Sequence, residues 1–308
     1  MQPTLGHKKP FPWHIVVFLA PAVLIYTVFM IYPLVDSLRL SFFTQNEFKV
    51  ETFAGVQNYV RLLTDSNWAP HFWNAVRNNV VFFAVHMLVQ NPIALLLATL
   101  LSRGGRGRGV YRTLIFTPTL LSVVIIGFIW QLILNPLWGI AGGLLRAIGQ
   151  PQLFQPWLGL PETALVTLSL ISVWQFVGIP MMLFYAALIG IPDELTEAAR
   201  VDGASHWAVF WRIKFPLILP TVGIVSILTF VGNFNAFDLV YTVKGAQAGP
   251  NFATDLLGTY FYRTFFGFQL QLGNPTMGAT VSTMMFLIIL AGVAVFFAWQ
   301  RRVQTYEL

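Results

Sequence analysis

The chain has 308 residues, of which 56% are apolar and only 10% are charged, and its formal net charge is +6. This composition is typical of a polytopic membrane protein and excludes a soluble globular domain. The absence of cysteine excludes a disulfide framework and a thiolate metal site, and the five histidines are too scattered to predict any metal site. The basic residues form no aromatic-interleaved patch, so we expect no nucleic-acid partner.

Apolar runs of membrane-spanning length predict six transmembrane helices in one membrane domain over residues 1–308. The first run is too long for a signal peptide, so we expect it to be a retained helix. The stretch 242–276 is expected to be an outer loop. The predicted spans cover about residues 14–34, 78–101, 113–134, 162–190, 217–241 and 278–299.

The second predicted span carries His86 and Gln90 at positions i and i+4, on one face of the helix. The pair fits two roles. It could form a polar seam that faces a transport pathway, or it could make interhelical hydrogen bonds that hold the bundle together. We favour the second role.

Basic residues concentrate in the two tails and in the short loops 102–112 and 191–216. The positive-inside rule therefore predicts cytoplasmic N- and C-termini and places the loop 191–216 in the cytoplasm. The glycine-rich stretch 103–108 lacks the Lys-Ser/Thr pair and the preceding strand of a phosphate-binding loop. The chain therefore shows no ATP site of its own.

The loop 191–216 is a polar island between two apolar segments, and its residues predict two short helices. Pro192 suits the first turn of the first helix, and Gly203 suits the position just after its end, with positive φ. Ser205 can cap the second helix, and Pro216 is expected to end it. The plain interpretation of such a segment is a solvated loop between two spans.

The spacing of residues in this loop resembles the EAA loop of ATP-binding-cassette (ABC) importer permeases. That pattern is Glu-Ala-Ala, three residues, Gly, nine residues, Ile, one residue and Leu-Pro. Here it runs from Glu197 to Pro216 and departs only at Phe215, where leucine is usual. The resemblance implies a type I ABC importer permease fold and a coupling helix that docks on a cytoplasmic ATPase. The coupling residues would be Glu197, Ala198, Ala199, Asp202 and Gly203.

Two further stretches resemble sugar-type permeases, namely 53–59 and 232–238. The second resembles a fifth-helix segment of maltose-type permeases in which Asn and Phe side chains contact the sugar. Beyond it, the loop up to Pro250 departs from the compact Gly-Gly-Pro of the family.

A continuous helix would place Thr229, Asn233 and Phe237 on one stripe, and would turn Asn235 to the opposite face. Hydroxyl, amide and aromatic groups suit a sugar, although helix packing is an alternative for each residue. The fourth span offers another aromatic and amide pair. The predicted substrate path comprises Thr229, Asn233, Phe237, Trp174 and Gln175.

Together the resemblances imply a permease subunit of an importer for a carbohydrate or polyol, in the inner membrane of a prokaryote. It would not be an enzyme by itself. The implied partners are a second homologous permease, an extracytoplasmic solute-binding protein and two ATPase subunits, which would carry ATP and Mg²⁺. This chain would hold no cofactor.

The spans lack a buried Arg or Lys, which favours a neutral solute over the alternative of a glycerol-phosphate ester or another small solute. A more distant alternative is a membrane-anchor subunit of a redox enzyme, with His14 and His86 as haem ligands. A secondary transporter would need an intramembrane ion site, and the spans show no paired carboxylates.

Overall fold

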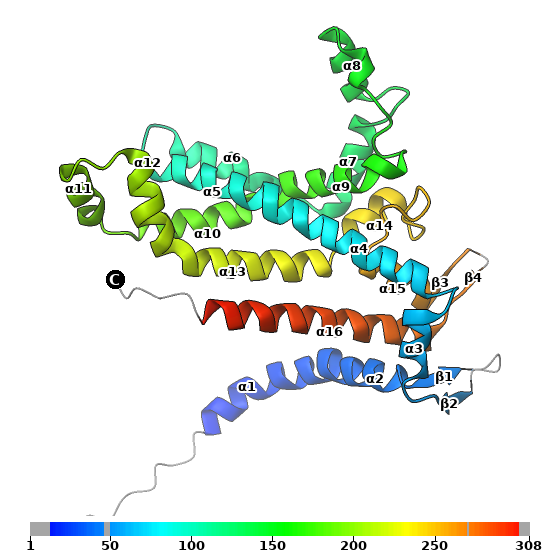
Figure 1. Ribbon diagram of the computed structural model, residues 1–308. Helices are drawn as coiled ribbons and strands as arrows, with labels where there is room; N and C mark the ends of the chain where they lie inside the picture. Colours follow the sequence, from blue (N-terminus) through cyan, green and yellow to red (C-terminus); the bar gives the residue numbers. More distant parts are fainter. Residues whose placement is uncertain (1–12, 46–49, 270, 302–308) are drawn as a thin grey trace, which may run out of the picture.

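The computed structural model describes residues 13–45, 50–269 and 271–301, which form a helical membrane bundle with two small β-hairpins (Figure 1). In this part of the chain, four helical stretches are long and apolar enough to cross a membrane, or six if each of two bent helix pairs is one span. The predicted all-helical, polytopic fold is confirmed. Of the basic residues in the two tails, Lys8, Lys9 and Arg302 lie outside the described residues.

Each of these four stretches is longer than the span predicted there, because its helices continue past the apolar run. Three of them contain a short π-helical segment, η1, η2 or η4. The first consists of α1 (Trp13–Tyr26), η1 (Thr27–Ile31) and α2 (Tyr32–Leu40), and the second of α4 (Ala69–Val85), η2 (His86–Gln90) and α5 (Asn91–Ser102). The third consists of α12 (His206–Val209), η4 (Phe210–Lys214), α13 (Phe215–Phe234) and α14 (Asp238–Lys244), and the last is α16 (Pro275–Gln300).

The third and fourth predicted spans are each two helices rather than one. The chain bends by 96° between α6 (Arg108–Leu120) and α7 (Val123–Ile133). It bends by 45° between α9 (Pro161–Phe176) and α10 (Gly178–Ile189). Pro118 lies in the last turn of α6, and Leu121 after it is extended. At the second bend a Cβ on Gly178 would lie 2.9 Å from the Cα of Phe116, so only glycine lets these two backbones approach so closely.

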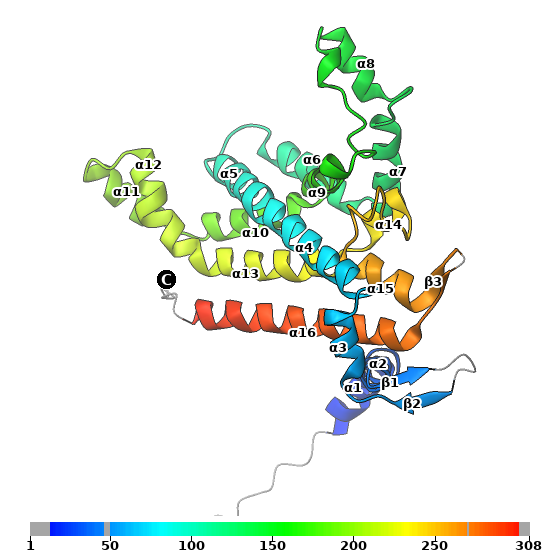
Figure 2. The same ribbon diagram turned by 45° about the vertical axis from the view of Figure 1, so that its right-hand side comes forward.

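The two ends of the bundle carry different structures (Figures 1 and 2). One end holds α11 (Asp193–Val201) and α12. The other holds two antiparallel hairpins, β1 (Phe43–Gln45) with β2 (Glu51–Phe53) and β3 (Gly267–Phe268) with β4 (Gln271–Leu272), together with α3 (Gln57–Thr64), α14 and α15 (Leu257–Phe266). The expected outer loop 242–276 is therefore largely structured. Helix α8 (Ile140–Ala147) and the 3₁₀ turn η3 (Pro151–Leu153) project from the bundle beyond α7.

Helices α5 and α10 pack closely because small residues of α5 lie at their contact. Ala94 and Ala98 of α5 are fully buried against Met181 and Phe184 of α10. By contrast, no residue is buried in the most apolar part of the stretch α1–α2. This stretch touches the bundle mainly along α16. An apolar helix with this exposure is suited to contact with lipid or with another transmembrane subunit.

Candidate functional site

A cavity of about 440 Å³ lies where α13 ends, between η2, the bend of α9 and α10, and the start of α7. Most of its lining is apolar or aromatic, with a few polar side chains among these groups. Such a mixture binds small organic ligands by burying their apolar faces and pairing their polar groups. The polar side chains on its wall are His86, Gln90, Ser172, Thr229, Asn233, Asn235 and Asp238.

Two of the predicted substrate-path residues occupy the last turns of α13. Thr229 is 8% exposed and Asn233 is 5% exposed, and both line the cavity. The Nδ2 of Asn233 donates to the carbonyl of Thr229 at 2.6 Å, and Thr229 exchanges hydrogen bonds with Asn91 at the start of α5. These bonds hold both side chains at the wall.

Phe237 also lines the cavity, but for a different reason from the one expected. Helix α13 ends at Phe234, and Phe237 has φ −144° at the start of α14, so the i, i+4 spacing on a continuous helix does not place it. Asn79 of α4 reaches this break, because its Nδ2 donates to the carbonyl of Asn233 at 2.9 Å and its Oδ1 accepts from the backbone N–H of Leu257 at 2.7 Å.

The prediction that Asn235 faces away from the path is wrong, because the same break turns it into the cavity wall. Asn235 is exposed, and its Nδ2 donates to the carbonyl of Val231 at 2.9 Å. The helix-wheel argument fails here because it assumed an α-helix where residues 235–237 form a turn.

Trp174 and Gln175 do not lie with the other predicted path residues. Helix α9 turns Ser172 and Phe176 toward the cavity, and Trp174 packs edge-on against Trp130 with ring centroids 5.6 Å apart. The Nε2 of Gln175 donates to the carbonyl of Leu121 at 3.2 Å, where α6 and α7 separate. Gln175 therefore satisfies a carbonyl that the bend leaves without a helical partner.

His86 and Gln90 are cavity residues that the sequence singled out without assigning them to the path. The Nδ1 of His86 donates to the carbonyl of Phe82 at 2.8 Å, and its Nε2 lies 3.0 Å from the Oγ of Ser172 on α9. The expected interhelical bond is thus present for His86. Gln90 makes no such bond, although it is 5% exposed.

At the far end of the bundle, α11 carries the predicted coupling residues. Glu197, Ala198 and Asp202 are exposed, and Ala199 is half-buried. Gly203 follows the helix with φ +84°, as expected from the sequence. The N–H of Gly203 donates to Arg200 and that of Ala204 to Ala199, at 3.0 and 2.9 Å, which is the pattern of a Schellman C-cap.

The second helix of this loop begins as predicted but does not end as predicted. The Oγ of Ser205 accepts from the N–H of Ala208 at 3.3 Å and caps α12. Pro216 does not end the helix, because the π-helical turn η4 comes directly before it and Pro216 lies in the first turn of α13. A residue in the first turn of an α-helix does not have to donate an N–H to the helix, so proline is tolerated there. The chain therefore continues as a helix into the bundle.

Comparison with known proteins decides the family. The model of the family described as "Binding-protein-dependent transport system inner membrane component" matches residues 90–305, which include α11 and all the cavity-lining residues except Phe82 and His86. The chain belongs to this family of transporter permeases.

Two similar curated permeases match almost end to end. The lactose transport system permease protein LacF of Rhizobium radiobacter is 33% identical over 273 residues, covering 88% of this chain and 89% of the relative. The sn-glycerol-3-phosphate transport system permease protein UgpA of Brucella abortus is 32% identical over 284 residues, covering 91% and 92%.

A solved structure supports the type I importer permease fold. A chain of a bacterial alginate ABC transporter, in complex with its alginate pentasaccharide-bound periplasmic protein, superposes with a TM-score of 0.80 over 96% of each chain at 21% identity. The predicted family and fold are confirmed, and family membership argues against the redox-anchor alternative. Both ring nitrogens of His86 are also engaged, and the side chain of His14 lies outside the described residues.

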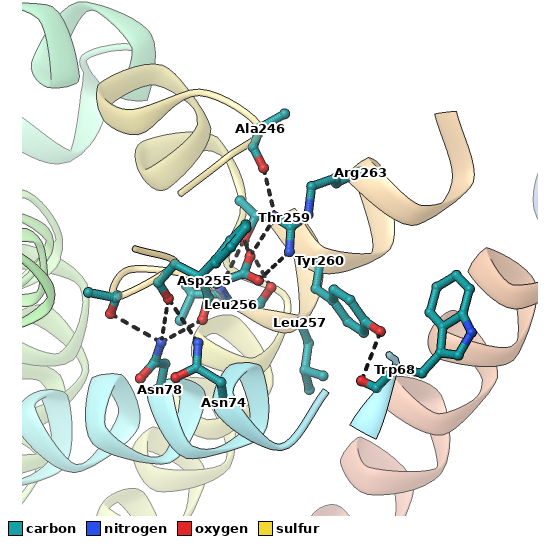
Figure 3. Close-up of polar contacts among 12 residues, drawn as sticks. Trp68, Asn74, Asn78, Ala246, Asp255, Leu256, Leu257, Thr259, Tyr260 and Arg263 are labelled. Carbon is teal, nitrogen blue, oxygen red and sulfur yellow. Dashed lines mark hydrogen bonds and ion pairs between the residues drawn. The ribbon is translucent and has the colours of Figure 1, made fainter. Parts of the chain in front are cut away.

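Buried polar groups of the permease hydrogen-bond the segment 252–257 to α4 (Figure 3). Asn78 donates to the carbonyls of Ala253 and Asp255 at 3.1 and 2.9 Å. Arg263 of α15 holds the Asp255 carboxylate through two nitrogens, at 2.6 and 3.3 Å. Burial raises the pKa of the Asp255 carboxyl, and the Arg263 guanidinium opposes this rise. This support fixes the segment that Asn79 joins to the end of α13.

Proposed function

We propose that this permease is the translocating subunit of an ATP-driven importer for an uncharged carbohydrate or polyol. Relatives named for lactose and for trehalose/maltose transport support this substrate class. The observation that carries the proposal is the lining of the cavity, where amide and hydroxyl groups lie beside aromatic rings. Amides pair with sugar hydroxyls, and an aromatic face covers the C–H side of the ring.

The charge of the cavity separates this substrate from a glycerol-phosphate ester. Among the described residues, no Lys or Arg lines the cavity, and the one carboxylate there is Asp238. A phosphate would need cationic donors to offset its desolvation. A neutral solute therefore fits better, although relatives named for sn-glycerol-3-phosphate are comparably similar.

In the proposed assembly, this chain pairs with a second permease, two cytoplasmic ATPase subunits and an extracytoplasmic solute-binding protein. Exposed α11 would dock on an ATPase, with its end of the bundle in the cytoplasm. ATP-driven movement of α11 would then expose the cavity to one side of the membrane and afterwards to the other. The ATP and Mg²⁺ would be held by the ATPase subunits.

Transport by the assembled complex tests this function. The complex in liposomes, supplied with its binding protein outside and ATP inside, should accumulate lactose, maltose, trehalose or glycerol. Uptake should cease when either the binding protein or the ATPase is omitted. Accumulation of sn-glycerol 3-phosphate but of none of the neutral solutes would overturn the proposed substrate class.

A further inference from the structure

Gln90 is buried in the wall of the cavity without a hydrogen-bond partner. The residue is 5% exposed, its Oε1 has no partner, and its Nε2 makes no hydrogen bond within the described part of the chain. The other two amides on the wall are engaged, because Asn233 and Asn235 each donate to a carbonyl of their own helix turn. A buried amide without partners is rare in folded proteins and calls for an explanation.

The neighbours of Gln90 hold it in this place. One turn earlier, His86 is bonded to Ser172 of α9, and at the next residue Asn91 is bonded to Thr229 of α13. Gln90 is thus the last residue of a π-helical segment that is fastened to two other helices. Its backbone cannot carry the amide away from the cavity without breaking those contacts, and π-helical segments occur often at functional sites.

We propose that Gln90 is a substrate-binding residue whose amide pairs with a hydroxyl group of the transported solute. The inference rests on the proposed function and deepens it. A primary amide can donate and accept, as can a hydroxyl, so the two groups satisfy each other with no charge involved. Gln90 lies on the η2 wall, and Asn233 and Phe237 lie on the wall formed by α13 and its end. A sugar in the cavity would contact both walls. The cavity would therefore favour sugars whose hydroxyl groups reach the polar side chains of both.

The chain offers a matched control in Gln175. This glutamine is 0% exposed and also has an unpartnered Oε1, but it lies outside the cavity and donates to the carbonyl of Leu121. Gln90→Leu should remove the amide from the cavity, whereas Gln175→Leu should remove an equivalent amide from the bend. Gln90→Met provides a second variant with a more flexible apolar side chain.

The experiment measures sugar binding to the purified permease–ATPase complex, without the binding protein. The probe is whichever of tritiated lactose, maltose, trehalose or glycerol the wild-type complex transports. Gln90→Leu and Gln90→Met should raise the Kd by about tenfold to hundredfold, the loss expected for one hydrogen-bonded group in a desolvated site. Gln175→Leu should leave the Kd unchanged and lower the melting temperature. Single-deoxy analogues sharpen the test, because one of them should bind wild type and Gln90→Leu equally.

The outcomes separate this inference from the proposed function. A wild-type complex that transports none of the neutral solutes would overturn both. Transport by wild type with an unchanged Kd in the Gln90 variants would overturn the inference alone. Loss of complex assembly in both Gln90 variants would show a structural role and would also overturn it.

Discussion

The turn after α11 and the break after α13 are built in opposite ways. At the first, Gly203 and Ala204 bond to carbonyls of the helix that has just ended, so the turn is fixed by residues close in sequence. At the second, the carbonyl of Asn233 is held by Asn79, which lies 154 residues away. A local turn keeps its shape wherever it is placed, whereas the break depends on the packing of the whole bundle. The proposed ATPase contact thus rests on local structure, and the cavity rests on tertiary structure.

The largest effect is expected in α11, the helix that ends in the locally fixed turn. Ala198→Trp places a bulky ring on the exposed face of α11 and should abolish copurification of the ATPase, because close approach needs small side chains there. Leu137→Trp, at another exposed position away from α11, is the control and should copurify normally. The permease pair should form with both variants. An Ala198→Trp complex at wild-type yield would contradict the assignment of α11.

The break should be sensitive to a residue far from it in sequence. Asn79→Leu leaves the carbonyl of Asn233 and the N–H of Leu257 without these partners, each at a cost of about 1–3 kcal/mol. The purified complex should lose activity at a distinctly lower temperature. Asn74→Leu removes one bond, to Phe252, and should lower the inactivation temperature less. Equal losses in the two variants would show that the break does not depend on Asn79.

Removing a cavity amide should impair binding rather than folding. Asn233→Ala should weaken sugar binding by about tenfold to hundredfold if its amide pairs with the solute. Asn235→Ala now serves as a comparison within the same wall, since Asn235 lines the cavity from an exposed position. We expect a smaller loss there, because a partner that water can replace contributes less. The two dissociation constants, measured with the same sugar, decide between the residues.

The smallest effect is expected at Gly203. A Cβ there would meet nothing within 4 Å, so the cost of Gly203→Val comes from φ +84° alone and should be about 1 kcal/mol or more. Insertion into the membrane should be normal, and ATPase affinity should fall. Gly203→Asn should restore much of it, since asparagine tolerates this conformation better. Equal affinities for the valine, asparagine and wild-type proteins would refute the turn argument.

The sequence predicted those features whose causes lie within a few residues. The end of α11, the cap by Ser205 and the fold class could be predicted because glycine, serine and apolar runs act locally. The positions of Phe237, Asn235 and Gln175 could not, because each depends on where a helix breaks. Those breaks are stabilised by residues from other helices, such as Asn79 at the Asn233 carbonyl and Gln175 at the Leu121 carbonyl. The asparagines at positions 74, 78 and 79 make this helix unusually polar. They were the signal in the sequence that it holds other segments by hydrogen bonds.

The close approach at Gly178 has a mechanical consequence. Backbones in direct contact leave no layer of side chains that could shear, so we expect α6 and the bend of α9 and α10 to move as one block. Three residues, 190–192, join α10 to α11, and the bend itself carries Phe176, Ile179 and Pro180, which line the cavity. A displacement of α11 should therefore reach the cavity as a rotation of this block, with little sliding of one helix past another. The smallest residue in this contact makes the transmission stiff.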